Sequence, residues 1–214
     1  MIRCYLVLML LVSSANAVTY ELKVGWNLFS PILSSSTAVS AYFETLKPGV
    51  LADIRKIWSY QSGEGWSSHT PGGSTATGGQ FDNLEPGLGY WVLMDAAHSI
   101  ELSDSFNSYN LALQGSGWKL IGMNSSQEIF LDSSDFLQQA NFTDSSADDI
   151  RKIWGFDGVW KSFSPADSAN DLTALKPGYG FWFLMLSDLE VNSQNINLND
   201  LFPPACPGCP SIGN

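Results

Sequence analysis

The sequence contains few cysteines, few histidines and few basic residues. Its 214 residues include three Cys, two His, and ten Lys or Arg against 21 Asp or Glu, which gives a net charge of −11. A chain without an excess of Lys and Arg is poorly suited to neutralising phosphates, so we expect neither nucleic acid nor an anionic membrane surface as a partner. The composition is still that of a folded protein, because 44% of the residues are apolar and 13% are aromatic.

The first seventeen residues have the three parts of a secretory signal peptide. Arg3 supplies the positive charge, residues 5–12 form a short apolar stretch, and residues 15–17 are a small-x-small cleavage site. The apolar stretch is shorter than the roughly 20 residues of a membrane span, which disfavours a retained anchor, and no second segment of spanning length follows. We therefore expect a secreted protein, extracellular, periplasmic or on the cell surface, with no membrane association after signal cleavage near Val18.

The expected mature chain keeps two cysteines, Cys206 and Cys209, within the sequence Pro-Ala-Cys-Pro-Gly-Cys-Pro. An oxidising compartment favours a disulfide, formed either within one chain or between two chains. A redox CxxC motif usually opens a helix, which Pro207 and Pro210 oppose, and a zinc site needs about four ligands. We predict a structural disulfide, no metal site and no cofactor.

Four sequence anchors occur twice, in the same order and about ninety residues apart. They are Gly-Trp-x-Leu at 25–28 and 117–120, Asp-Ile-Arg-Lys-Ile-Trp at 53–58 and 149–154, a tryptophan at Trp66 and Trp160, and Leu-x-Pro-Gly-x-Gly-aromatic-Trp at 84–91 and 175–182. Self-similarity at a fixed period indicates tandem modules. We predict four parts of the chain: a signal peptide (1–17), module 1 (18–105), module 2 (106–194) and a Pro- and Cys-containing C-terminal tail (195–214) that serves as a linker or flexible end.

Each module is expected to combine short strands with one helix. Residues 20–28 are predicted as one strand, and residues 39–46 place apolar side chains on one helical face after a Ser-rich stretch (34–37) suited to capping. A shorter helix is expected around residues 136–140 of module 2. The predicted fold class is α+β and β-rich, with two tandem homologous small β-sheet modules that each carry one short helix.

The repeated hexapeptide predicts a strand in each module, followed by a glycine-containing hairpin turn. Residues 90–94 and 181–186 are apolar on both faces, which predicts central strands with a covered surface on each side. We expect the helix on one side and a second sheet or the sister module on the other. The last strands are predicted at 99–102 and 189–192.

These repeated strings resemble a module of bacterial and archaeal secreted and cell-surface proteins. That module has the form GWNLxS, then a W-x-Y strand, then LxPGxGYW, and the resemblance covers both copies. Module 2 departs from it at Lys119, which replaces the asparagine, and at residues 121–124, which replace a Ser-Leu-Pro-like run. The resemblance implies an extracellular or surface accessory domain, and no catalytic residues come with it.

No catalytic constellation is recognisable in the sequence. His69 and His98 fall only in module 1, and no HxxxH, GxSxG, P-loop or dinucleotide motif occurs. The aspartates between 132 and 149 lack EF-hand spacing, so solvated loop acids are the default interpretation, with calcium binding as the alternative. We therefore expect a non-catalytic protein, while a hydrolase with an unrecognised site stays open because distant carboxylates can meet in a fold.

Eight tryptophans are a high number for this chain length. Core packing is the ordinary role of aromatic rings in β-structure, and it is expected for the tryptophans that sit beside glycine in apolar strands. Trp66 and Trp160 instead border a hairpin turn and precede polar residues. We select Trp66, Trp160 and the neighbouring Tyr60 and Phe156 as candidate ligand-binding residues, because exposed aromatic rings stack on sugar faces and loops carry function.

The leading hypothesis is a secreted, non-catalytic binding or adhesion protein whose partner is a glycan or cell-surface polymer. The first alternative is a self-associating structural subunit of a surface layer or extracellular filament. The second alternative is an unrecognised extracellular hydrolase. Burial of Trp66 and Trp160 is the observation that would most weaken the glycan hypothesis.

Overall fold

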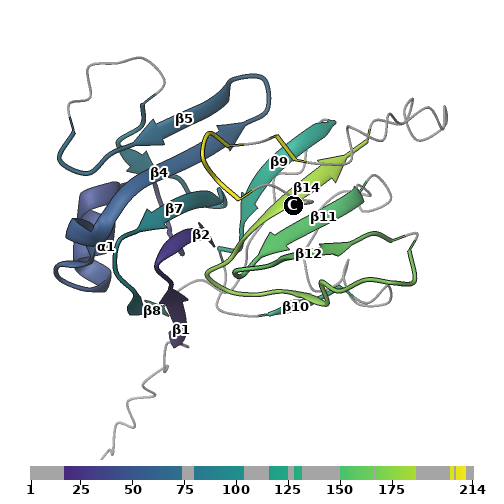
Figure 1. Ribbon diagram of the computed structural model, residues 1–214, viewed down its shortest axis with the longest axis horizontal. Helices are drawn as coiled ribbons and strands as arrows, with labels where there is room; N and C mark the ends of the chain where they lie inside the picture. Colours follow the sequence, from purple (N-terminus) through teal and green to yellow (C-terminus); the bar gives the residue numbers. More distant parts are fainter. Residues whose placement is uncertain are drawn as a thin grey trace, which may run out of the picture.

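The computed structural model describes residues 17–73, 80–103, 116–124, 128–131, 150–165, 167–186, 203–204 and 206–210. The fold is β-rich, as predicted, and consists of small antiparallel sheets with one α-helix in these ranges (Figure 1). None of the described residues forms a helix of the length and apolar character that crossing a bilayer requires.

The first half of the chain contains these elements: β1 (Ala17–Leu22), β2 (Gly25–Phe29), β3 (Thr37–Ala38), α1 (Val39–Leu46), the 3-10 turn η1 (Val50–Asp53), β4 (Ile54–Gln61), β5 (Gly65–His69), β6 (Asn83–Leu84), β7 (Tyr90–Met94) and β8 (His98–Ser103). The second half contains these: β9 (Gly117–Gly122), β10 (Ile129–Phe130), β11 (Ile150–Phe156), β12 (Trp160–Phe163), β13 (Ala174–Leu175) and β14 (Gly180–Met185).

Two four-stranded antiparallel sheets form the body of the protein. The N-terminal sheet has the strand order β5-β4-β7-β2, and the C-terminal sheet has the order β12-β11-β14-β9. Each order places the hexapeptide strand (β4 or β11) between its hairpin partner and the strand that follows Pro-Gly (β7 or β14). The prediction that residues 90–94 and 181–186 form central strands is therefore confirmed.

Alternation along β7 explains why this strand is apolar on both faces. Tyr90, Val92 and Met94 face a core that contains helix α1 and the two-stranded β1–β8 sheet, whereas Trp91 faces the opposite way. Successive side chains of a strand point to opposite faces, so a covered strand needs apolar residues at every position. β14 follows the same rule, with alternate residues in a second core and in the layer between the sheets.

The predicted helix is confirmed, but its predicted cap is wrong. Helix α1 begins after Ala38, and no side chain caps it. The backbone N–H of Val39 donates instead to the carbonyl oxygen of Asp82 at 2.9 Å, beside the β3–β6 pair. A tertiary backbone contact thus takes the place of the serine cap that the local sequence predicted.

The prediction of one strand over residues 20–28 is also wrong. The chain turns at residues 23–24, and Gly25 enters β2 with a φ of 89°, a left-handed conformation that suits glycine. β1 pairs with β8 in a separate sheet, whereas β2 pairs with β7. The helix predicted around 136–140 and the strand predicted at 189–192 lie outside the described residues.

Candidate functional site

The two large sheets face each other across a shared layer of apolar, mostly aromatic side chains, which we call the aromatic layer. It comprises Trp26, Leu28, Trp58, Tyr60, Trp66 and Trp91 of the N-terminal sheet, Trp118, Leu120, Trp154, Phe156, Trp160, Trp182, Leu184 and Leu186 of the C-terminal half, and Cys206 with Cys209. Trp91 and Trp182 are only 2% and 1% exposed, as core residues are expected to be. The sister sheet thus covers the second face of each central strand.

The four predicted ligand-binding residues all lie in the aromatic layer. Trp66 contacts Tyr60 at a ring-centroid distance of 5.3 Å, and both contact Trp182 of the other sheet, at 5.6 and 5.2 Å. The other half repeats this arrangement with Trp160, Phe156 and Trp91. Phe156 and Trp160 lie 5.3 Å apart and contact Trp91 at 5.2 and 5.6 Å.

Trp66 and Trp160 are partly exposed, but their polar atoms are not. The indole N–H group of each is buried and has no hydrogen-bond acceptor among the described residues. Edges and faces of both rings already contact neighbouring aromatic rings across the sheets. A ligand in solvent can therefore reach only the remaining part of each ring, and the ligand-binding role of this pair stays a prediction.

The repeated Pro-Gly-x-Gly turns join the two sheets through their backbones. The N–H of Ser30 donates to the carbonyl oxygen of Gly178, and in the corresponding contact Gly122 donates to Gly87, both at 2.9 Å. A Cβ atom at Gly122 would collide with the Leu88 carbonyl group of the opposite sheet. Gly122 and the repeated glycines Gly89 and Gly180, where an added Cβ would lie 2.9 and 3.1 Å from a carbonyl oxygen, thus permit a close approach between the sheets.

Asn124 adds a polar link between the two halves. Its Oδ1 accepts a hydrogen bond from the Leu33 N–H, and its Nδ2 donates to the Leu33 carbonyl oxygen at 2.7 Å. The side chain is 8% exposed, so both bonds lie away from solvent. A buried amide that satisfies one residue's donor and acceptor fixes the relative position of the two segments.

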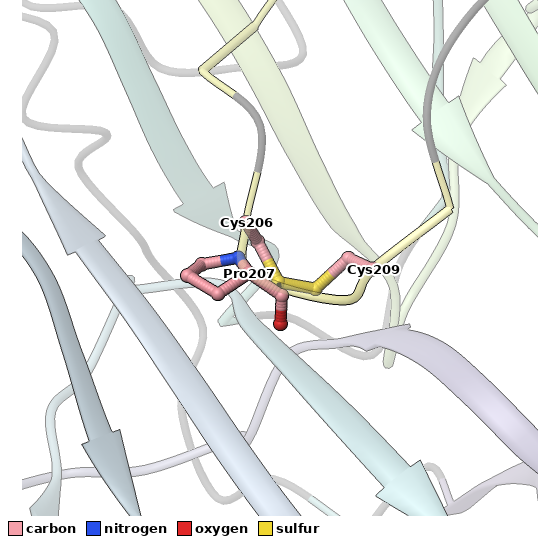
Figure 2. Close-up of a disulfide and its surroundings, with 3 residues drawn as sticks. All are labelled: Cys206, Pro207 and Cys209. Carbon is pink, nitrogen blue, oxygen red and sulfur yellow. Dashed lines mark hydrogen bonds between the residues drawn. A yellow bond between two sulfur atoms is a disulfide. The ribbon is translucent and has the colours of Figure 1, made fainter.

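Cys206 and Cys209 of the C-terminal tail lie against the aromatic layer, whereas most of the tail predicted as a linker or flexible end lies outside the described residues. Cys206 and Cys209 form a disulfide within the chain, with Pro207 in the intervening turn (Figure 2). Cys206 is 6% exposed and belongs to the aromatic layer. Figure 1 shows this yellow segment between the two large sheets.

A pocket of about 90 Å³ opens beside strand β12, and we call it the β12 pocket. Its apolar wall consists of Phe156, Leu172, Tyr179 and Phe181, and its polar rim consists of Asp157, Lys161, Asp171, Thr173 and Lys176. Phe156 is the one predicted ligand-binding residue that lines it. An apolar wall with a few convergent polar groups is the usual make-up of a small-molecule site.

An ion pair holds one side of the β12 pocket. Lys161 Nζ lies 2.9 Å from Asp157 Oδ2, and Lys23 Nζ donates to the Asp157 carbonyl oxygen at 2.6 Å. Burial raises the pKa of Asp157, but the hydrogen bond and charge of Lys161, a backbone hydrogen bond at Val159 and the charge of Lys23 together bring this pKa below its ordinary value. The Asp157 hydrogen bond and charge raise the pKa of Lys161, so the pair is ionised at neutral pH.

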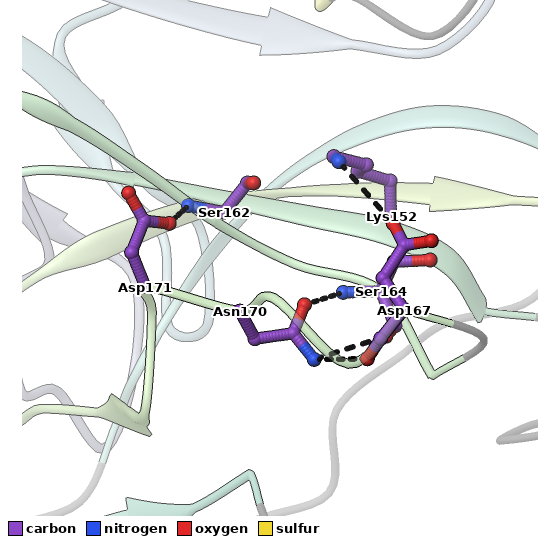
Figure 3. A network of polar contacts seen from close by, with 6 residues as sticks. All are labelled: Lys152, Ser162, Ser164, Asp167, Asn170 and Asp171. Atoms are coloured by element: carbon purple, nitrogen blue, oxygen red, sulfur yellow. Dashed lines mark hydrogen bonds and ion pairs between the residues drawn. The ribbon is translucent and has the colours of Figure 1, made fainter.

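A hydrogen-bonded loop leads to Asp171, which lines the pocket (Figure 3). Asn170 accepts from the Ser164 N–H at 2.8 Å and donates to the Ser164 and Asp167 carbonyl oxygens at 3.2 and 2.9 Å. This short Asn-anchored turn brings Asp171 back to β12, where its Oδ1 accepts from the Ser162 N–H at 2.6 Å. The carboxylate is thus held in place by the backbone of an edge strand.

The charged rim is a property of the second half alone. At the positions that correspond to Lys161, Lys176 and Tyr179, the first half has a serine, a glutamate and a leucine (67, 85 and 88). Neither Asp171 nor Lys176 was selected from the sequence. The available signal was the divergence between the two copies at positions that flank conserved anchors.

The described residues contain no cluster of three His, Cys, Asp or Glu side chains suited to a metal ion. The aspartates between 132 and 149 lie outside them. No family model, curated protein or solved structure matches this chain. Function therefore has to be inferred from the geometry of the β12 pocket and the aromatic layer.

Proposed function

We propose that this protein is a secreted, non-catalytic binding protein that recognises a sugar unit of a glycan or surface polymer in the β12 pocket. The observation that carries the proposal is the combination of an aromatic wall with fixed polar groups at its rim. A sugar ring has an apolar face that packs against aromatic rings and hydroxyl groups that need hydrogen-bond partners. The volume of about 90 Å³ is below the usual range of small-molecule sites, so the pocket would hold part of one sugar ring rather than a long stretch of polymer.

The polar rim supplies both acceptors and donors. Asp171 uses Oδ1 for the Ser162 N–H, and its Oδ2 has no partner among the described residues. The Thr173 side chain is exposed at the pocket rim and can donate or accept. Both residues line the pocket, so the hydroxyl groups of a sugar bound there could bond to either.

The pKa shift at Asp157 argues against a general-acid role for this residue. A glycosidase needs one carboxyl group that stays protonated near neutral pH, with its pKa raised. The pKa of Asp157 is lowered instead. The ionised pair with Lys161 suits a fixed polar wall.

The test is a glycan array followed by calorimetry with the best ligand. Asp171→Asn keeps an oxygen for the Ser162 N–H, and Thr173→Val keeps the side-chain shape, so both variants should fold. Each should weaken binding about fivefold to tenfold, which is the loss expected for one hydrogen bond. Thr19→Val, at an exposed strand position outside the pocket lining, is the matched control and should bind like the wild type.

Two results would overturn the proposal. One is the absence of any binding on a broad array. The other is binding that survives both pocket variants but is lost in Trp66→Phe or Trp160→Phe with the fold intact, which would move the site to the aromatic pair.

A structural subunit is the second candidate function, favoured by one surface feature. Val24 and Val159 are 66% and 61% exposed, and their turns are joined by the bond from Lys23 to the Asp157 carbonyl oxygen. Neighbouring exposed apolar side chains are typical of contact surfaces. If this surface mediates assembly, light scattering at physiological salt should show concentration-dependent oligomers that Val24→Ser with Val159→Ser abolishes, whereas a monomer at all concentrations would exclude this role.

A further inference from the structure

The β12 pocket is lined by as many cations as anions in a protein that is otherwise strongly acidic. Lys161 and Lys176 line the pocket together with Asp157 and Asp171, and Lys23 bonds to the Asp157 carbonyl oxygen. Lys23 and Glu21 also act on pocket residues, so three cations meet three anions here, against a net charge of −11 for the whole chain. A site that is balanced in charge repels an anionic ligand less than the rest of an acidic surface does.

The lysines of the pocket differ in their partners. Lys161 is paired with Asp157 at 2.9 Å, and Asp171 adds to the field that raises the Lys161 pKa. The Lys176 ammonium group, by contrast, forms no ion pair or hydrogen bond with any residue in the described part of the chain. It lies at the rim of the pocket on the turn that leads into β14.

We infer that the β12 pocket selects a sugar that carries a carboxylate, such as a uronic acid unit, with the carboxylate on Lys176 and the hydroxyl groups on Asp171 and Thr173. This inference rests on the proposed function and adds the charge of the ligand to it. A single lysine acts as a point charge, which suits one carboxylate. Multiply charged phosphates are more often held by several donors or by a planar Arg fork.

The apolar wall restricts the ligand further. Leu172, Phe181 and the half-buried Tyr179 line the pocket, so a small carboxylate without a ring, such as acetate, would leave this apolar surface in contact with water. A uronic acid has a ring that can pack against the apolar wall, hydroxyl groups for the polar rim and a carboxylate for the Lys176 ammonium group. A uronate inside a polymer and a free uronic acid share this chemistry, and the experiment below separates them.

The experiment is calorimetry of the full mature chain with three probes: methyl glucuronide, methyl glucoside and a glucuronate-containing oligosaccharide. The wild type should prefer the glucuronide over the glucoside by about twofold to fivefold at low salt, since an exposed ion pair contributes no more than this. Lys176→Gln should reduce the affinity for the glucuronide to that for the glucoside and leave the glucoside affinity unchanged. Lys47→Gln, which removes an exposed lysine at the end of helix α1, is the charge-matched control and should retain the preference.

The outcomes separate the two proposals. If the glucoside binds as well as the glucuronide, or if the preference survives Lys176→Gln, the carboxylate inference is wrong while sugar binding stands. If none of the three probes nor any neutral glycan binds, the proposed function itself fails. Stronger binding of the oligosaccharide than of the monosaccharide identifies a polymer-bound uronate, and equal binding identifies the single unit, both of which support the inference. A preference that shrinks in 1 M salt also supports it, because screening weakens exposed ion pairs.

Discussion

Glycine-to-alanine substitutions at the junction of the two sheets should reduce stability in a defined order. Gly89, Gly122 and Gly180 all belong to the repeated contact between a Pro-Gly-x-Gly turn and the opposite sheet, and none of them has a left-handed backbone. A Cβ at Gly122 would collide with the Leu88 carbonyl group, which cannot swing aside. At Gly89 the nearest atoms are 2.9 and 3.0 Å away, and at Gly180 the nearest atom is 3.1 Å away.

The size of each effect follows from three contributions. Overpacking costs about 1–3 kcal/mol, with the upper part of this range expected where backbone must move. Displacing the Gly122 N–H from the Gly87 carbonyl oxygen, now 2.9 Å apart, costs a further ~1 kcal/mol. Alanine also restricts the unfolded chain more than glycine does, which raises the stability of every variant by about 0.4–1 kcal/mol. We expect losses of about 3 kcal/mol for Gly122→Ala, about 1–2 for Gly89→Ala and at most about 1 for Gly180→Ala.

Urea unfolding monitored by tryptophan fluorescence measures this series, because the aromatic layer lies at the junction. With an m-value of about 3 kcal/mol/M, Gly122→Ala should lower the midpoint by about 1 M. Ser40→Ala on the exposed side of α1 is the control and should change stability by less than about 0.5 kcal/mol. If Gly122→Ala is as stable as the wild type, or less damaging than Gly180→Ala, the close approach of the sheets is not what these glycines provide.

Three further predictions concern other links in the fold. Asn124→Ala should lower stability by about 2–4 kcal/mol in urea unfolding, because it leaves the buried N–H and carbonyl groups of Leu33 without partners; an unchanged midpoint would contradict this bond. Burial raises the pKa of Tyr42 well above its ordinary value, against a smaller opposing contribution from its hydrogen bond to the Ile32 N–H. Its phenol should therefore stay protonated above pH 10 while the unfolded chain ionises, so stability should fall as pH rises past about 10; ultraviolet titration that showed every tyrosine ionising near pH 10 in the folded state would refute this. Replacing Cys206 and Cys209 together by serine should cost up to about 2 kcal/mol and change the near-ultraviolet circular dichroism of the aromatic layer, whereas an unchanged spectrum would place the C-terminal segment away from the tryptophans.

Several elements were predictable because their signals are local. Alternation and glycine-containing turns identified the strands that became β4, β7 and β11, and the apolar spacing over 39–46 identified α1. The central place of β7 also followed from the sequence, because a strand that is apolar on both faces needs cover on both. The cap of α1 failed as a prediction because the Asp82 carbonyl oxygen, distant in sequence, supplies the partner.

The candidate site was harder to predict than the fold. Its lining comes from strands β11, β12, β13 and β14, the turn after β11, the loop before β13 and the turn before β14. No spacing motif links such positions, so Asp171 and Lys176 carried no recognisable signal by themselves. The aromatic pair Trp66 and Trp160 was conspicuous in the sequence for a different reason, since both rings serve the contact between the sheets.

The sequence alone determined that the chain would build β-rich units from repeated Gly, Trp and Pro-Gly anchors, because strand alternation and turn chemistry act within a few residues. Only the tertiary structure decided what the anchors contact. The sequences of their own strands do not determine whether Trp91 and Trp182 face solvent, a ligand or another sheet. They face the opposite sheet because the glycine turns let the two backbones come within hydrogen-bonding distance. At this distance the aromatic side chains of the two sheets contact each other, which removes their apolar surfaces from water.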